Sequence, residues 1–191
     1  MTATFASDLF GHDTMKRDAI FVDGHRIELH RRWGPGPTAC IIGHNPSNAA
    51  ADRDDPTSKW WTNWCQLFGF GGYVATNLYP FVTADPRECY KIVDEINGGV
   101  NWSARDALHY VNLPAVVAAA KAADQVFVCW GGIARDDEWI EHVIEEIQSG
   151  AEPYPDLWCW GKTAYGAPKH PMARGHHRIA PDQPPILWRA A

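Results

Sequence analysis

The chain has 191 residues, of which 46% are apolar and 21% charged, a composition typical of a folded domain that excludes disorder as the main state. No apolar run approaches about 18 residues, and residues 1–13 lack the basic start and apolar stretch of a signal peptide, so we expect a cytoplasmic protein without membrane contact. The net charge of −6 disfavours tight nonspecific binding to nucleic acid.

In chain order, the predicted elements alternate between strands and helices. Residues 1–18 are interpreted as a flexible leader, and apolar stretches on both sides of Asp23-Gly24 predict a β-hairpin over 19–30. Four short apolar runs are typical of strands buried on both faces of a parallel sheet: 39–42, 73–76, 125–130 and 157–160. Helical periodicity is present over 57–68, 113–120 and 140–147.

This alternation predicts the fold class. Residues 19–191 are expected to form a single α/β domain, a three-layer αβα sandwich with a central, mainly parallel four-stranded sheet and an N-terminal β-hairpin. In such folds, ligands bind beyond the carboxyl ends of the strands. Small or polar residues follow each of the four apolar runs, so functional residues are expected at these strand ends.

The first candidate segment follows the first apolar run and reads Gly43-His44-Asn45-Pro46-Ser47. Asn45 could hold a water molecule or a substrate amide there. Asp54 or Asp55, a few residues later, could act as a base or stabilise a developing cation. The alternative is a capped turn that starts the next helix, because Asn, Ser and Asp are common loop residues.

Two further strand ends carry an amide and several aromatic rings. Asn77 closes the second run and could pair with a base edge, while Tyr79 or Phe81 stacks on the ring. The alternative is a turn with core aromatics. Trp130 precedes Gly131-Gly132, a glycine pair that would allow close approach of a ligand but does not form a phosphate-loop pattern. A purely structural turn is favoured at this third position.

The fourth candidate segment, over 169–178, is basic. His170 could donate a hydrogen bond to a developing oxyanion, and Arg174 and Arg178 could hold phosphates. Residues 157–191 contain five Lys or Arg side chains and a single Asp, so an anionic partner could dock there despite the acidic total. An ordinary solvated tail with incidental histidines is the alternative.

Metal and thiol chemistry have weaker signals. His44, Asp54, His176 and His177 offer possible ligands, but no H-E-x-x-H or H-x-D pattern joins them. The five cysteines are odd in number and contain no C-x-x-C pair, so a zinc ribbon or a redox motif is not expected. Cys40, Cys129 and Cys159 lie inside apolar runs and are interpreted as small buried side chains. No metal and no cofactor are therefore expected.

Taken together, several motifs resemble a bacterial and phage family catalogued as domain of unknown function 1643, over roughly residues 25–175. They are Arg31-x-Trp33-Gly34, Asn45-Pro-Ser with Asp54-Asp-Pro-Thr57, Asn77-Leu-x-x-Phe81, Trp130-Gly131 and His170-Pro171. The layout is more distantly similar to the uracil-DNA glycosylase superfamily, which has a four-stranded parallel sheet between helices. The segments of this sequence that correspond to the motifs of that superfamily are Gly43-His44-Asn45-Pro46, Asn77, Trp130-Gly131 and His170-Pro171.

The second resemblance implies roles for individual residues. Asn45 would position the attacking water or the sugar, and Asn77 would bond the base edge. His170 would stabilise negative charge on the departing base. The sequence departs from the superfamily at Asn45, where the most active uracil branch has an aspartate, and after His170-Pro171, where Met172 is the only apolar candidate for a wedge.

The sequence thus predicts a nucleobase-recognising enzyme that hydrolyses the N-glycosidic bond of a modified base, with DNA or a nucleotide as partner. The alternatives are a non-catalytic base- or nucleotide-binding module of a defence or DNA-modification system, and a metal-dependent hydrolase. The predicted catalytic residues are Asn45, His170, Asp54 and Asp55. The predicted base-binding residues are Gly43, His44, Asn77, Tyr79, Phe81 and Trp130, and the predicted phosphate- or DNA-binding residues are Ser47, Lys169, Arg174 and Arg178.

Overall fold

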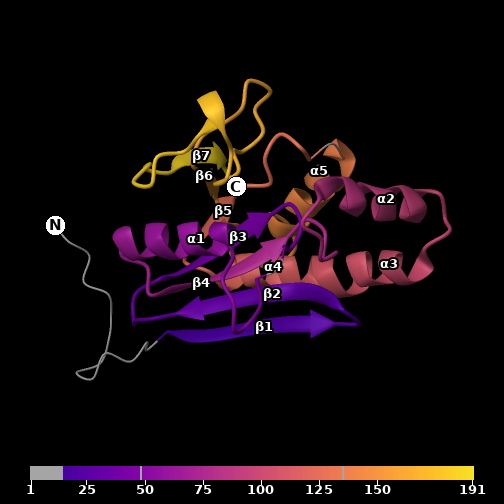
Figure 1. The fold of residues 1–191 in the computed structure, drawn as a ribbon, viewed down its shortest axis with the longest axis horizontal. Helices are drawn as coiled ribbons and strands as arrows, with labels where there is room; N and C mark the ends of the chain where they lie inside the picture. The colour runs from indigo at the N-terminus through magenta and orange to yellow at the C-terminus, as the bar shows by residue number, and fades with distance from the viewer. Residues whose placement is uncertain (1–14, 48, 135) are drawn as a thin grey trace.

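The computed structural model describes residues 15–47, 49–134 and 136–191. Within these residues, seven strands form one mixed sheet in the order β1-β2-β4-β3-β5-β6-β7. Figure 1 shows β1 and β2 at one end of the sheet and β6 and β7 at the other. None of the helices in these ranges is long and apolar enough to cross a membrane.

The predicted N-terminal hairpin is confirmed, and it is part of the main sheet. Strands β1 (Lys16–Val22) and β2 (His25–Arg32) are antiparallel, and Asp23 and Gly24 turn between them with φ of 49° and 81°. Strand β2 then pairs antiparallel with β4. Because β1 begins at Lys16, residues 16–18 of the predicted leader are strand, while residues 1–14 lie outside the described part of the chain.

The four predicted buried strands form the parallel core of the sheet. They are β3 (Thr38–Gly43), β4 (Gly72–Asn77), β5 (Gln125–Val128) and β6 (Leu157–Cys159), paired in the order β4-β3-β5-β6. A strand that the sequence did not reveal, β7 (Ile186–Arg189), pairs antiparallel with β6. The sheet is therefore larger than the predicted four strands and mixed rather than mainly parallel.

Helices lie against both faces of this sheet. The predicted helices are α1 (Pro56–Leu67), α4 (Leu113–Ala122) and α5 (Asp137–Ile147). Helices α2 (Pro86–Asn97) and α3 (Trp102–Asp106) were not predicted, nor was the π-helical segment Ala107–Asn112 that joins α3 to α4. A short 3₁₀ turn, Gly175–His177, follows β6 near the chain end.

Strand β3 separates two hydrophobic cores. Its Cys40 and Ile42 pack with side chains of α2, α4 and α5, whereas Ala39 and Ile41 face the opposite core. That second core holds Trp64 of α1, whose ring meets those of Trp160 and Phe127 edge-on at 5.1 Å. Alternate side chains of β3 are thus buried on both faces, which is why its sequence is continuously apolar.

Candidate functional site

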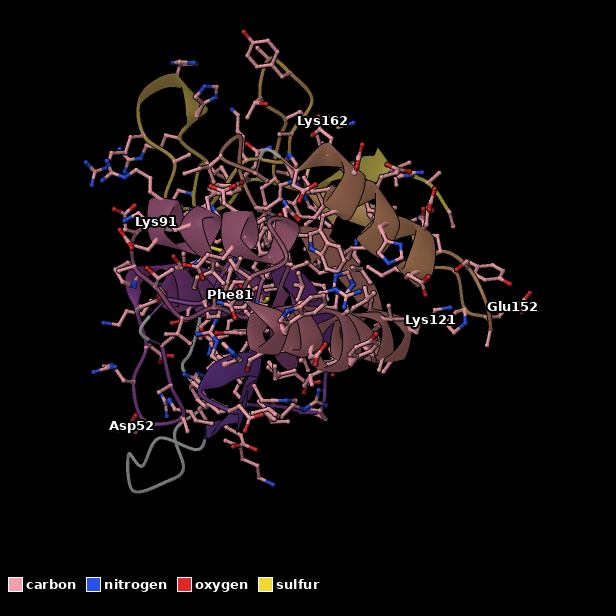
Figure 2. All side chains as sticks on the ribbon, turned by 90° about the vertical axis from the view of Figure 1, so that its right-hand side faces the viewer. Asp52, Phe81, Lys91, Lys121, Glu152 and Lys162 are labelled. Atoms are coloured by element: carbon pink, nitrogen blue, oxygen red, sulfur yellow. The ribbon has the colours of Figure 1, made fainter. Side chains whose placement is uncertain are left out.

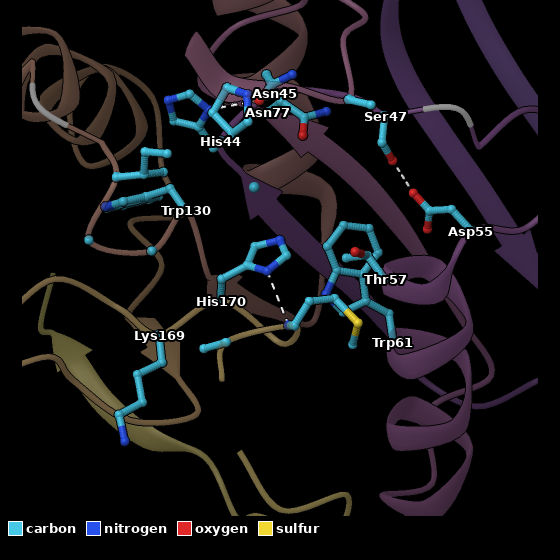
Figure 3. Close-up of a pocket in the computed structure, with 18 of the residues that line it drawn as sticks. His44, Asn45, Ser47, Asp55, Thr57, Trp61, Asn77, Trp130, Lys169 and His170 are labelled. Carbon is cyan, nitrogen blue, oxygen red and sulfur yellow. Dashed lines mark hydrogen bonds between the residues drawn. The ribbon is translucent and has the colours of Figure 1, made fainter. Parts of the chain in front are cut away.

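A cavity of about 490 Å³ opens at the carboxyl ends of the parallel strands. Segments that follow β3, β5 and β6, the end of β4 and the N-terminal half of α1 all contribute to its lining. Figure 3 shows His170 between Trp130 on one side and Trp61 on the other. The predicted site residues that line this cavity are Gly43, His44, Asn45, Ser47, Asp55, Asn77, Trp130, Lys169, His170 and Arg174.

The other predicted site residues lie elsewhere. Tyr79 and Phe81 are each 1% exposed and belong to the hydrophobic core, so the predicted stacking of these rings on a base is corrected. Figure 2 shows Phe81 within the packed interior. Asp54 Oδ1 accepts a hydrogen bond from Nε of buried Arg31 at 2.8 Å and lies 2.7 Å from its Nη2 in an ion pair, and exposed Arg178 is not part of the lining. Asp54 therefore anchors a loop to β2, and its predicted catalytic role is corrected as well.

Asn77 presents a buried amide at the end of β4. Its side chain is 2% exposed, and its Nδ2 has no hydrogen-bond partner within the part of the chain that the structure describes. Asn112 fixes the strand end by donating from Nδ2 to the carbonyls of Asn77 and Leu78, at 3.0 and 3.3 Å. Gly43 on neighbouring β3 provides space, because a Cβ there would meet Asn77 Oδ1 at 2.9 Å. An unsatisfied buried donor costs about 1–3 kcal/mol, so an acceptor atom of a ligand at Nδ2 would be bound favourably.

His170 is a neutral hydrogen-bond donor. The backbone N–H of Met172 donates to His170 Nδ1 at 3.1 Å, so this nitrogen carries a lone pair. Burial lowers the pKa of His170 to about 4, which leaves the ring neutral at pH 7 with its proton on Nε2. Figure 3 shows the second ring nitrogen pointing into the cavity. Gly131 permits this position of the ring, since a Cβ at Gly131 would lie 3.2 Å from His170 Cβ.

Asp55 supplies a fixed negative charge on the opposite wall. It caps α1, accepting from the backbone N–H of Ser58 at 2.7 Å and from the hydroxyl of Ser47. Burial by itself would raise the pKa of Asp55, but these hydrogen bonds and the nearby charge of Arg26 hold it below its usual range. The carboxylate is therefore ionised at neutral pH. The predicted helix cap and the predicted cavity carboxylate are the same residue.

Asn45 connects the segment after β3 to the segment after β4 by hydrogen bonds at this edge of the cavity. Its Nδ2 donates to the carbonyls of Thr83 and Phe81 at 2.8 and 3.3 Å, and its Oδ1 lies 2.8 Å from His44 Nδ1. His44 Nε2 is in turn 3.1 Å from the hydroxyl of Tyr90. Because these polar atoms all contact other protein groups, we assign Asn45 to positioning of the His44 segment, in place of the predicted contact with water.

The sequence analysis did not identify Arg26 as a cavity residue. It lies in β2, is 3% exposed and lines the cavity, and its Nε has no hydrogen-bond partner among the described residues. Thr163, after β6, also lines the cavity, and its buried hydroxyl has no partner among those residues either. An arginine that alternates with apolar residues in a strand is normally interpreted as solvent-facing, so no sequence signal marked Arg26.

The metal ligands considered from the sequence do not form a metal site in the described part of the chain. Among those residues, no group of three or more His, Cys, Asp or Glu side chains could hold a metal ion. Of the set considered from the sequence, Asp54 is paired with Arg31, and the rings of His176 and His177 lie against each other at 3.8 Å. The five cysteines are free thiols and all are buried, as the sequence predicted for Cys40, Cys129 and Cys159.

Comparison with known proteins identifies a family. The family model described as Protein of unknown function (DUF1643) matches residues 26–172, which include every cavity-lining residue except Ala173, Arg174 and His177. No curated protein and no solved structure matches the chain. The family resemblance noted in the sequence is thereby confirmed, whereas nothing in these comparisons supports a relation to the uracil-DNA glycosylases.

Proposed function

The chain belongs to the DUF1643 family, and from the chemistry of its cavity we propose that it is a nucleobase-recognising enzyme that hydrolyses an N-glycosidic bond in DNA or a nucleotide. The proposal includes a fold related to the uracil-DNA glycosylases. One observation carries it: the four segments selected from the sequence by their likeness to that superfamily all line the same cavity. They contribute Gly43, His44 and Asn45 from the first segment, Asn77 from the second, Trp130 and Gly131 from the third and His170 from the fourth.

The base end of the cavity would be formed by Asn77 and His170. Both present an N–H donor that no protein acceptor uses among the described residues, one from a side-chain amide and one from a neutral imidazole. Bases carry carbonyl oxygens and ring nitrogens on their edges, and these are the acceptors that such donors bind. Trp130 and Trp61 provide flat apolar walls that suit an aromatic ring.

The proposed reaction breaks the bond between the sugar C1′ and the base nitrogen, and its electron pair leaves with the base. The Nε2–H of His170 would hydrogen-bond the carbonyl oxygen on which negative charge develops. The Asp55 carboxylate would stabilise the sugar cation, since its low pKa keeps it charged. Water then adds its oxygen to C1′ and releases one proton to solvent. A base inside a duplex would first have to be flipped out.

A non-catalytic binding module is the second candidate, and one observation favours it. The hydrogen bonds of Asn45 are made within the protein, and the low pKa of Asp55 makes it a weak base. The cavity therefore lacks an evident strong base to activate water. Such a module would bind the same base through the same donors and leave the glycosidic bond intact.

Release of free base from DNA and nucleotides tests the proposal. Wild-type protein and Asn77→Leu would be incubated with genomic DNA, hypermodified phage DNA and a nucleotide pool. The released bases would be quantified by mass spectrometry. Tyr110→Ser, on an exposed side chain of the π-helical segment away from the cavity, is the control. We expect one base to be released by wild type and control and not by Asn77→Leu. Retention of a nucleotide without any released base would overturn hydrolysis in favour of the binding module.

A further inference from the structure

Two buried arginines of β2 differ in how their guanidinium groups are satisfied. Arg31 contacts Asp54 through Nε and Nη2, and it also donates to the carbonyls of His30 and Ala50 at 2.8 and 2.7 Å. Among the described residues, Arg26 makes a single hydrogen bond, from Nη1 to the Ala49 carbonyl at 3.0 Å. The first arginine is fully used in anchoring the loop over 49–54, whereas the second has donors left over.

The unused donors of Arg26 are costly unless a ligand meets them. The side chain is 3% exposed, and its Nε has no hydrogen-bond partner in the described ranges 15–47, 49–134 and 136–191. No carboxylate among the described residues forms an ion pair with Arg26, although the charge of Asp55 acts on it from a longer distance. A guanidinium stays protonated near neutral pH, and a buried charge without a partner is strongly unfavourable. Arg26 therefore has the properties of a binding residue whose counter-ion comes from outside the protein.

The rest of the cavity lining also favours a negatively charged ligand. Among the described residues, its lining includes the cationic side chains of Arg26, Lys169 and Arg174 but one carboxylate, Asp55. Within the part of the chain that the structure describes, neither Lys169 nor Arg174 forms an ion pair. This excess of positive charge stands out in a protein with a net charge of −6, and it would attract an anionic ligand to this one place.

We propose that Arg26 binds a negatively charged group of the ligand, so that the cavity takes a phosphorylated nucleotide unit in preference to a neutral base or nucleoside. The inference deepens the proposed function and rests on it for the presence of a base. The planar guanidinium fork suits the oxygens of a phosphate, which accept two parallel hydrogen bonds. The phosphate belongs either to a free nucleoside monophosphate or to the backbone of a strand.

Binding of inorganic phosphate and of matched nucleoside and nucleotide pairs tests this assignment. Calorimetry would compare phosphate with chloride at equal ionic strength, then each nucleoside with its monophosphate, and finally a short single strand that lacks terminal phosphates. The variants are Arg26→Gln, which removes the charge, and Arg26→Lys, which keeps it. Lys59→Gln removes one positive charge from the exposed side of α1 and serves as the matched control.

We expect wild type and Lys59→Gln to bind phosphate specifically, and to bind a monophosphate or the strand at least about 10-fold more tightly than the nucleoside. Arg26→Gln should lose about 10- to 100-fold of that preference, the range given by hydrogen bonds to charged groups. Arg26→Lys should retain part of it. A tighter monophosphate points to a free nucleotide, and a tighter strand to a polymer.

Equal affinity for nucleoside and nucleotide in wild type, or an unchanged preference in folded Arg26→Gln, would overturn the role of Arg26. Should Arg26→Gln unfold, the comparison of phosphate with chloride on wild type and Arg26→Lys still decides the question. Arg26-dependent phosphate binding without any base release would contradict the proposed hydrolysis alone. Base release with no dependence on phosphate would contradict this inference alone.

Discussion

The backbone N–H of Met172 donates to Nδ1 of His170 at 3.1 Å, and this one contact determines which nitrogen of the ring faces the cavity. It comes from the segment that directly follows His170-Pro171, so the chain orients its own histidine within two residues. With the pKa of His170 lowered by burial to about 4, the ring can donate a hydrogen bond but carries no charge. A neutral donor of this kind can stabilise a developing anion, and it does not repel the cationic sugar.

The first prediction concerns the pH dependence of stability. The pKa of His170 is about 4 in the folded protein and about 6.5 when unfolded, so the folded state resists protonation. Stability from this group is present in full above pH 6.5, is lost as pH falls from 6.5 to about 4, and is then constant. The loss is on the order of 3 kcal/mol. Urea unfolding of wild type and His170→Gln between pH 4 and 7 measures it. A difference between the two proteins that does not change with pH would contradict the assigned pKa.

The pH profile of activity gives a second prediction. Since the neutral form of His170 is the proposed donor, base release should not decline near pH 6.5, where an ordinary histidine becomes charged. It should decline only as pH approaches about 4. Single-turnover rates from pH 4.5 to 8 check this. A fall in the rate of base release centred near pH 6.5 would mean that His170 titrates as an ordinary, solvent-accessible histidine.

Asn77 should separate stability from activity. Its Nδ2 has no hydrogen-bond partner to lose among the described residues, so Asn77→Leu, of similar shape, should change the free energy of unfolding by less than about 1 kcal/mol or increase it. Base release should fall at least about 100-fold, in the range seen when one preorganised donor is removed. Thermal unfolding and rate measurements on the same preparation check both parts. A strongly destabilised variant would instead make Asn77 a structural residue.

Arg31 and Asp54 should behave in the opposite way. Breaking this largely buried ion pair leaves an uncompensated charge, so Asp54→Asn should lower the free energy of unfolding by about 3 kcal/mol. At a temperature where the variant is folded, its base release should remain within a few fold of wild type, because Asp54 does not line the cavity. Denaturant unfolding and rate measurements test this. Loss of activity in a fully folded Asp54→Asn would restore the catalytic role predicted from the sequence.

Gly43 offers a geometric test of the base-binding end. A Cβ at Gly43 would press on Asn77 Oδ1 at 2.9 Å, so Gly43→Ala should displace the amide and reduce base release. Gly34→Ala is the matched control, since its nearest neighbour is Gly71 Cα at 4.0 Å. We expect about a 10-fold loss for the first variant and none for the second, since an ångström of misplacement at a reacting site is already costly. Equal effects of the two substitutions would argue that the Asn77 amide is not held against the ligand.

The parallel core could be predicted because burial on both faces makes β3, β4 and β5 continuously apolar. Edge strand β7 could not, since its four residues are half-exposed or exposed and follow two prolines. Helix α2 could have been found: Asp85 and Pro86 start it, and Cys89, Val93 and Ile96 form its buried stripe.

The site was predictable to the extent that strand ends identify it. Asn77 and Trp130 come directly from that rule, whereas His170 was chosen from the basic segment over 169–178 and from the His-Pro motif of the glycosylase resemblance. The rule fails for Tyr79 and Phe81, because an aromatic ring after a strand can turn into the core as readily as into a cavity. It also fails for Arg26, whose burial depends on the loop over 49–54, a contact between distant parts of the chain that no local pattern records.

A double-mutant cycle on base release tests the central claim most directly, namely that Asn77 and His170 act on one base in one cavity. Single-turnover rates would be compared for wild type, Asn77→Leu, His170→Gln and the double variant, each shown to be folded. Residues that act as a unit give non-additive losses, so we predict a double variant within about 10-fold of the worse single one. Losses that multiply, or a wild-type rate in either single variant, would contradict the account.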